Sequence, residues 1–249
     1  MQDRLVTPFV QPIVDINSGC IVGLESLARS EVPGLETPAK MFEAAELLEQ
    51  APNLSAICRS KAIEAAHRLP ATQRLFLNTH PAEQLNKDLL RSVCDIRERF
   101  PALRLVIEVH EDLVEELAKA REFSRELAKH GVELALDDFG SGLCRMNEIL
   151  RLRPDFVKFD RSMISGIDRT PPAELQAISL LIESLKSLSI RCVAEGIEHH
   201  AEAAVCRQLG FELAQGFHFA YPATIDSYPL NCGTCVEAPQ RWPPNMRRV

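Results

Sequence analysis

The strongest constraint on the fold of this 249-residue chain is a regular alternation between short apolar runs and longer segments with helical periodicity. Short runs rich in Val, Ile, Leu and Phe predict buried strands, whereas apolar residues spaced three and four apart predict helices. The predicted strands lie at residues 8–16, 20–29, 75–80, 103–111, 132–138, 154–160, 190–198 and 211–217. The predicted helices lie at residues 38–49, 54–69, 81–100, 113–131, 146–153, 172–188 and 200–209.

Strands that alternate with helices pair in parallel through right-handed crossovers. The first two strands differ, because only the turn sequence Asn17-Ser18-Gly19 separates them, which is typical of a hairpin. A hairpin followed by six strand–helix units predicts a TIM-like (β/α)8 barrel with an antiparallel first strand. No GxGxxG or Walker A loop is present, which disfavours a nucleotide-binding open sheet. We expect the barrel to occupy residues 1–222. Residues 223–249 lose periodicity and gain Pro and Cys, so we expect an irregular C-terminal tail.

Composition limits the classes of partner. The formal net charge is -7 and no block of like charge occurs, which argues against a DNA- or RNA-binding surface. No apolar stretch approaches the ~20 residues that span a bilayer, and the first residues lack the apolar core of a signal peptide. The sequence therefore predicts a cytoplasmic protein with no direct membrane span.

Eight cysteines are present, most of them inside apolar patterns where a free thiol behaves as a small hydrophobic group. One close pair, Cys232 and Cys235, occurs near the C-terminus. A single CxxC pair without further ligands favours free thiols over a metal or redox site.

Polar side chains stand at or near the C-terminal ends of the predicted strands. These residues are Glu25, Asn78, Glu108, Asp137, Asp138, Lys158, Glu195 and Gln215. In a barrel the parallel strands end on one face, where barrel enzymes place their chemistry. Gathering several carboxylates there costs several kcal/mol of repulsion and desolvation unless a cation offsets it. All-oxygen ligands favour Mg²⁺ or Mn²⁺, and a pair of such ions is a standard device for phosphodiester hydrolysis.

Each of these residues alone also has an ordinary explanation. A strand-end carboxylate is often a helix N-cap, Asn78 is a possible cap of the helix near Pro81, and Lys158 is a possible rim partner of Asp160. We favour one shared site for these residues, because the alternative needs a separate ordinary explanation on nearly every strand. Within the cluster, we expect Asp137 to end its strand and Asp138 to begin a loop that the following glycines allow to turn, so that both carboxylates face metal.

Several motifs in combination resemble one family. They are QPIV at 11–14, ESLAR at 25–29, LNTHP at 77–81, IEVHE at 107–111, DDFGSG at 137–142, VKFDRSMI at 157–164, VAEGIE at 193–198 and AQGFHFAYP at 214–222. From about Phe9 to Pro222 the chain resembles the EAL domain, a barrel that hydrolyses cyclic di-GMP to linear pGpG. Ser26 stands where the family has the Ala of its Glu-Ala-Leu motif.

The resemblance implies specific roles. One metal ion would be held by Glu25, Asn78, Glu108 and Asp137. A second would be held by Asp137 and Asp138, with Glu195 completing the site directly or through water. Lys158 would orient or polarise the attacking water, and Glu195 would also act as a general base. Substrate contacts would come from Gln11, Leu27, Arg29, Asp160 and Gln215, with the Arg29 guanidinium suited to a phosphate. Glu111 would hold the loop after the aspartates.

The resemblance also implies cofactors and partners. Two Mg²⁺ or Mn²⁺ ions and cyclic di-GMP are expected, together with a homodimer formed through helices beside the loop that follows the aspartates. A fused or separate sensory or GGDEF domain is a further expected partner. Because the chain begins near the family's own start, we expect a stand-alone protein or an excised domain.

One loop departs from the family pattern. Leu143, Cys144 and Arg145 replace hydroxyl and aromatic groups, and Ser30 replaces a frequent Trp. Two alternatives to a cyclic di-GMP phosphodiesterase stay open, and the altered loop favours the first. The first is a degenerate EAL domain that senses cyclic di-GMP or acts through protein partners. The second is a metal-dependent barrel phosphodiesterase with another substrate.

Overall fold

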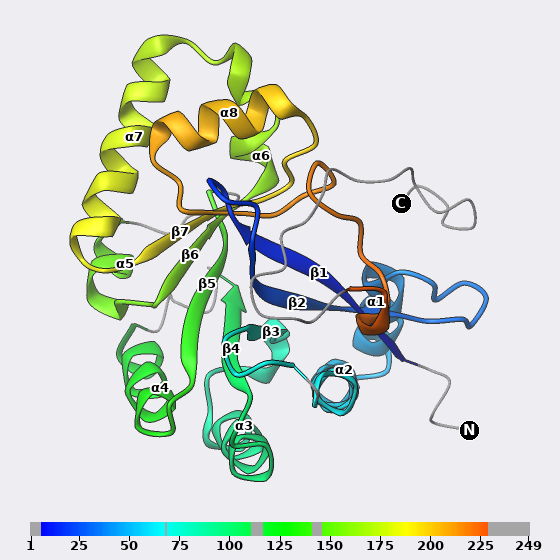
Figure 1. Cartoon of the computed structure of the whole chain (residues 1–249). Helices are drawn as coiled ribbons and strands as arrows, with labels where there is room; N and C mark the ends of the chain where they lie inside the picture. The colour runs from blue at the N-terminus through cyan, green and yellow to red at the C-terminus, as the bar shows by residue number, and fades with distance from the viewer. Residues whose placement is uncertain (1–5, 68, 111–116, 141–145, 229–249) are drawn as a thin grey trace.

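A computed structural model of the chain describes residues 6–67, 69–110, 117–140 and 146–228, within which eight strands close into a barrel in chain order (Figure 1). The strands are β1 (Thr7–Asp15), β2 (Ile21–Arg29), β3 (Arg74–Asn78), β4 (Arg104–His110), β5 (Glu133–Phe139), β6 (Phe156–Phe159), β7 (Arg191–Ala194) and β8 (Leu213–Ala214). β1 runs antiparallel to β2 and β8, and the other neighbouring strands are parallel. The predicted (β/α)8 barrel with an antiparallel first strand is confirmed.

The hairpin between β1 and β2 is closed by the side chain of Asp15. Its Oδ1 atom accepts hydrogen bonds from the Asn17 and Ser18 amides, at 3.1 and 2.7 Å, and from the Ser18 hydroxyl at 2.8 Å. Gly19 follows at φ +70°, in the left-handed region that glycine tolerates. The polar turn sequence thus satisfies its own backbone and sends β2 back alongside β1.

The helices lie around the outside of the barrel (Figure 1). They are α1 (Pro38–Leu47), α2 (Ala51–Ala66), α3 (Lys87–Arg99), α4 (Leu117–Lys129), α5 (Met146–Leu152), α6 (Arg161–Ile164), α7 (Pro172–Ser187) and α8 (His200–Leu209). Short 3-10 turns occupy η2 (Pro81–Glu83), η4 (Ile167–Arg169) and η5 (Ile225–Ser227). No helix among the described residues is long and apolar enough to cross a membrane.

The prediction of one helix over residues 81–100 is wrong. The chain forms only a 3-10 turn at η2, passes through Gln84 at φ +52° and restarts as α3. The restart is set by Asn86, whose Oδ1 accepts from the amides of Asp88 and Leu89, each at 3.0 Å. An N-cap inside an otherwise helical pattern therefore separated the two segments.

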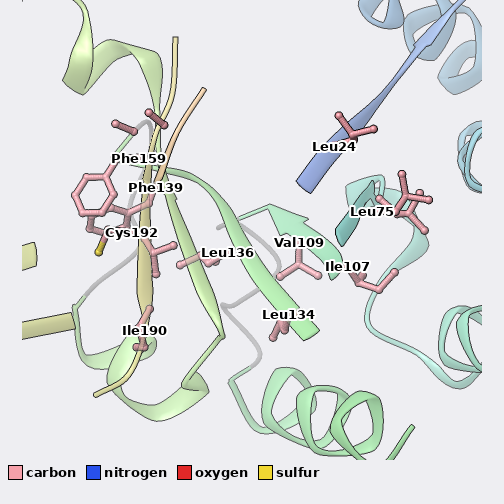
Figure 2. Packing of buried hydrophobic residues seen from close by; sticks show 14 of the residues in the cluster. Leu24, Leu75, Ile107, Val109, Leu134, Leu136, Phe139, Phe159, Ile190 and Cys192 are labelled. Carbon is pink, nitrogen blue, oxygen red and sulfur yellow. The ribbon is translucent and has the colours of Figure 1, made fainter. Parts of the chain in front are cut away.

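Two apolar layers hold the barrel. The outer layer joins the strands to the helices and includes Leu134, Phe159 and Cys192, part of which Figure 2 shows. The inner layer is a plug built from strand residues alone, namely Ile13, Phe76, Val106, Ala135, Phe156, Val193 and Leu213. On β2 this level is occupied by Gly23, where a Cβ would lie 2.7 Å from the Phe76 ring, and the partly buried Val22 packs against the plug. The plug fills the barrel interior, so a site on the barrel axis must lie beyond the plug.

Residues just after the predicted end of the barrel also contact it. Ala223 exchanges backbone hydrogen bonds with Val10 of β1, at 2.7 and 3.0 Å, and Ile225 of η5 is buried. The proposed boundary at residue 222 and the irregular nature of the segment that follows stay predictions.

Candidate functional site

A ring of polar side chains lies next to the apolar plug. Alternate residues of a strand face the same side. On each of β3 to β8, the residue two positions after the plug residue is polar. On β2, the residue two positions after Gly23 is polar. On antiparallel β1 the polar residue lies two positions before Ile13 and pairs with Glu25 in register. This polar ring consists of Gln11, Glu25, Asn78, Glu108, Asp137, Lys158, Glu195 and Gln215. It sits at the C-terminal ends of the parallel strands and contains all the strand-end residues predicted from sequence except Asp138, which follows Asp137.

Lys158 of β6 lies at the centre of the polar ring. Its Nζ atom is 2.6 Å from Glu108 Oε1, 2.8 Å from Asp137 Oδ1 and 2.9 Å from Glu195 Oε1. Glu25 Oε2 lies slightly further away, at 3.6 Å. The lysine side chain is only 1% exposed, so four carboxylates and one ammonium share a nearly dry space. The alternative of a rim ion pair with Asp160 is not what the structure shows.

Amide side chains orient the carboxylate of Glu25. Asn78 Nδ2 donates to Glu25 Oε1 at 3.1 Å, and Gln215 Nε2 donates to Glu25 Oε2 at 2.7 Å. Gln215 Nε2 also lies 3.2 Å from Gln11 Oε1, and Gln11 Nε2 donates to the carbonyl of Ala220 at 3.0 Å. The alternative of Asn78 as a helix cap fails, because the ring of His80 accepts the Ala82 amide at the start of η2. The ring amides therefore fix a carboxylate rather than a helix end.

The two adjacent aspartates are brought together by a bulge in β5. The β5–β6 register shifts between Leu136 and Phe139, and Asp138 adopts φ +56°. A regular strand would send neighbouring side chains to opposite faces, and a bulge re-aims one of them. The expectation that Asp138 begins the loop was wrong, because β5 continues to Phe139. The turn of the carboxylate comes from the left-handed conformation of Asp138 itself, which Asp tolerates better than most residues.

Burial and mutual repulsion perturb the acidic groups of the site. Burial raises the pKa of Glu108 and of Glu195 well above the ordinary value, and the Lys158 charge opposes this in both. Burial also raises the pKa of Asp138 to about 6, with a further contribution from the charge of Asp137. Burial alone would lower the pKa of Lys158, but the surrounding carboxylates outweigh it and raise that pKa well above its usual range. The site thus holds a charged ammonium and carboxyls that retain protons unusually well.

The same side chains form a suitable cradle for divalent cations. Asp137, Asp138 and Glu195 each offer an oxygen, and these atoms lie within 4.8 Å of one another. Glu108 Oε2 and Gln215 Oε1 are buried without a hydrogen-bond partner in the described part of the chain, and unpaired buried acceptors are unusual. Carboxylate and amide oxygens are the donors that Mg²⁺ and Mn²⁺ prefer. The residues present therefore fit the predicted ions.

Two hollows flank the polar ring. One, of about 310 Å³, is lined by residues that include Leu27, Phe42 and Asn78. The other, of about 160 Å³, is lined by residues that include Asp160, Glu195 and Phe217. Glu25 lines both. The ring is thus open to a ligand from either side.

Of the predicted substrate residues, Leu27 lines the first hollow and Gln11, Asp160 and Gln215 line the second, whereas Arg29 lines neither. Leu27 and Arg29 follow Glu25 at two-residue spacing on β2, so they continue its face outward. The guanidinium of Arg29 lies 5.9 Å from the Phe9 ring centroid and donates to the Ala28 carbonyl at 2.8 Å. Asp160 caps α6 by accepting the Ser162 amide at 2.8 Å. Glu111, the loop at 143–145 and the Cys232–Cys235 pair lie outside the described residues.

Sequence reasoning missed His110. It follows Glu108 at two-residue spacing on β4, and its Nε2 atom lies 3.5 Å from Asp138 Oδ2. The period-two pattern that located Glu108 extends to His110, so the signal was present in the IEVHE motif. An imidazole thus adjoins the otherwise oxygen-lined cluster.

Fold and site together define a barrel protein with an acidic candidate metal centre on the C-terminal face of its parallel strands. The family profile of the EAL domain matches residues 1–222, and the chain belongs to the EAL domain family.

Known relatives and structures agree with this assignment. PdeG of Escherichia coli (strain K12), named a probable cyclic di-GMP phosphodiesterase, is 26% identical over 231 residues, which are 88% of this chain and 45% of PdeG. The PaMucR phosphodiesterase in its c-di-GMP complex is 25% identical with a TM-score of 0.81, covering 91% of this chain and 95% of that one. A manganese/c-di-GMP complex of BlrP1 from Klebsiella pneumoniae is 26% identical with a TM-score of 0.78, covering 90% of this chain and 57% of BlrP1.

The curated relatives are longer than this chain. It spans 32%, 45% and 42% of the length of three of them. The matched part is therefore less than half of each of these three proteins.

Proposed function

We propose that this chain hydrolyses cyclic di-GMP to linear 5′-pGpG with the help of two divalent cations, Mg²⁺ or Mn²⁺. The observation that carries the proposal is the polar ring, in which four carboxylates from separate strands converge on one buried lysine. The names of similar proteins support the substrate, because PaMucR is a phosphodiesterase in complex with c-di-GMP. The manganese in the BlrP1 complex supports the choice of cofactor.

Two groups of side chains would hold the ions. Glu25, Asn78, Glu108 and Asp137 would bind one, and Asp137, Asp138 and Glu195 would bind the other. Bound in this way, divalent cations neutralise phosphate charge and lower the pKa of water. The raised pKa of the free carboxyls of Glu108, Asp138 and Glu195 reflects burial first and repulsion by neighbouring carboxylates second, and bound cations would offset both.

The remaining chemistry belongs to the chain's own residues. Lys158 carries fixed positive charge and can donate hydrogen bonds to the attacking water, which orients it. Glu195 would accept the proton that this water loses, since its Oε1 lies 2.9 Å from the Lys158 ammonium that would orient the water. At the end of β2, the guanidinium of Arg29 would bind a phosphate of the substrate as a fork. Gln11, Leu27, Asp160 and Gln215 would line the groove around the rest of the dinucleotide.

A second candidate function is binding of cyclic di-GMP without turnover. The changed loop residues Leu143, Cys144 and Arg145 favour it, because the Leu143 and Cys144 side chains cannot supply the same strong hydrogen bonds as the family's usual loop. We rank the enzyme first because every proposed ligand and catalytic side chain is present, and loss of such a group typically costs several orders of magnitude in rate. A related phosphodiesterase acting on another substrate is the third candidate.

One experiment separates these functions. The purified chain is incubated with cyclic di-GMP and Mg²⁺ or Mn²⁺, and the products are resolved by chromatography. Linear pGpG is expected from the parent chain, none from Asp137→Asn or Glu25→Gln, and an unchanged amount from the exposed control Glu43→Gln. Absence of product at high protein concentration would contradict the enzyme. Calorimetric binding without product would then favour the sensor, and turnover of another compound in a substrate panel would favour the third candidate.

The assembly is also a proposal. We expect a homodimer formed through the helices beside the loop after Asp138, and a fused or separate sensory or GGDEF partner. Light scattering of the purified chain tests the dimer, and a monomer at all concentrations would contradict it. The cytoplasmic location and the lack of DNA and RNA partners stay predictions.

A further inference from the structure

A buried ion pair lies on the outer side of β3, behind the strand end that carries Asn78. Arg59 of α2 and Glu83 of η2 are 2% and 8% exposed. Arg59 Nη2 contacts Glu83 Oε1 at 2.6 Å and Arg59 Nη1 contacts Glu83 Oε2 at 2.8 Å. Ser55 Oγ donates to Glu83 Oε2 at 2.5 Å and accepts from Arg59 Nη1 at 2.9 Å. We call Ser55, Arg59 and Glu83 the clamp.

The clamp grips the backbone on both sides of Asn78. Arg59 Nη1 donates to the Asn78 carbonyl at 3.3 Å, and Glu83 Oε2 accepts the His80 amide at 2.9 Å. Thr79, between Asn78 and His80, is held by β4 instead. Its amide and hydroxyl both donate to the Glu108 carbonyl, at 3.1 and 2.7 Å. Three consecutive residues at the end of β3 are therefore fixed by α2, η2 and β4.

Packing alone does not explain the clamp. A buried ion pair costs desolvation, and hydrophobic residues of similar volume often stabilise a fold equally well. What hydrophobic residues cannot supply is a donor for the Asn78 carbonyl and an acceptor for the His80 amide. These two bonds determine the direction of the Asn78 side chain, whose Nδ2 donates to Glu25 Oε1 and to the Ser26 carbonyl. With both donations fixed, the amide oxygen of Asn78 has a defined direction.

We propose that Arg59 and Glu83 are positioning residues for the metal site, acting through the backbone of Asn78. This inference rests on the proposed function, because Asn78 is one of the residues proposed to hold a cation. The clamp holds the Asn78 amide next to Glu25, whose Oε1 it contacts at 3.1 Å, and Ser55 and Arg59 also line the hollow that adjoins Asn78. Groups that orient metal ligands in this way typically change metal affinity about 10–100-fold when mutated.

The test is Mn²⁺ binding measured by electron paramagnetic resonance in the absence of nucleotide, so turnover is not the readout. Arg59→Lys keeps the charge but loses the fork, and Glu83→Gln keeps an acceptor but loses the charge. The matched controls are Arg74→Lys and Glu133→Gln, which break another bidentate pair with contacts of 2.7 and 3.1 Å, near the N-terminal ends of β3 and β5. All variants are compared well below their melting temperatures.

We expect Arg59→Lys and Glu83→Gln to bind Mn²⁺ at least about tenfold more weakly than the parent, and both controls to bind it as the parent does. Hydrogen exchange should rise over residues 78–83 in the clamp variants alone. Parental Mn²⁺ affinity in the clamp variants, or an equal loss in the controls, would overturn the inference while leaving the proposed metal site intact. A parent chain that bound no Mn²⁺ would overturn both.

A milder variant keeps the test decisive if Arg59→Lys fails to fold. Ser55→Ala removes only the hydroxyl that bridges the two charges. It is expected to weaken Mn²⁺ binding less than Glu83→Gln does. A folded Ser55→Ala and a folded Glu83→Gln that both match the parent would refute the positioning role.

Discussion

Replacement of Lys158 by methionine removes the one cation at the centre of the polar ring. In the parent, its ammonium lies within 3.6 Å of Glu25, Glu108, Asp137 and Glu195 and is almost completely buried. Breaking a buried charge pair by deleting one partner costs about 3–5 kcal/mol. For a chain of this size each kcal/mol shifts the melting temperature by roughly 2–4 °C, so we expect Lys158→Met to melt about 6–20 °C lower in EDTA.

The assay is thermal unfolding of parent and variant in EDTA and in excess Mn²⁺. Cations can replace the missing charge, so Mn²⁺ should raise the melting temperature of Lys158→Met more than that of the parent. Lys129→Met is the control, because the exposed Lys129 pairs with Glu126 at the surface and such pairs contribute about 0–1 kcal/mol. A Lys158→Met protein that melted within about 2 °C of the parent in EDTA would refute the reasoning.

The loss of folding stability in Lys158→Met should also depend on pH. In Lys158→Met, the positive charge that lowers the pKa of Glu108 and of Glu195 is missing. Both carboxyls therefore hold protons to higher pH in the folded state. A folded state that binds more protons than the unfolded state loses stability as pH rises. The stability of Lys158→Met should therefore lie further below that of the parent near neutral pH than in mild acid. A difference independent of pH would contradict this electrostatic explanation.

Three further outcomes are expected. Because burial raises the pKa of Asp138 to about 6, protons should compete with Mn²⁺ as pH falls through that value, and a Mn²⁺ titration insensitive to pH between about 5 and 7 would argue against Asp138 as a ligand. Gly140→Ala should destabilise the fold by more than Gly34→Ala in chemical denaturation. Both glycines have positive φ, at +99° and +88°, but only at Gly140 would an added Cβ overlap with Met163 Sδ. Equal losses of stability would show that this contact is irrelevant. Burial raises the pKa of Cys192 to about 12, so this thiol should resist alkylation until the chain unfolds, and rapid labelling of the native protein would refute its burial.

The barrel itself was predictable because its signal is repeated along the whole chain. Apolar runs alternate with helical segments, and a turn at Asn17-Ser18-Gly19 sets the one antiparallel pair at the start. The same period-two spacing that makes the plug also places a polar residue beyond it on every strand. Parallel strand ends meet on one face, so residues as distant in sequence as Glu25 and Gln215 could be predicted to lie together.

Other features depend on contacts that periodicity does not encode. The bulge that aims Asp138 is a local left-handed conformation, and the break before α3 depends on a single cap at Asn86. The clamp joins α2 to η2 through Arg59 and Glu83. From the sequence of its own segment alone, each of these charged residues would be predicted to lie at the surface. Only the packed structure shows that both are buried. His110 lies within the same period-two pattern on β4, but its imidazole is not among the oxygen donors that predict a Mg²⁺ or Mn²⁺ site.

The central claim is that the polar ring binds two divalent cations, and anomalous diffraction from a crystal soaked in Mn²⁺ tests it most directly. The account predicts two anomalous peaks roughly 3.5–4 Å apart, one among Glu25, Asn78, Glu108 and Asp137 and the other among Asp137, Asp138 and Glu195. No peak inside the ring at saturating Mn²⁺, or strong peaks only at other surfaces, would contradict it.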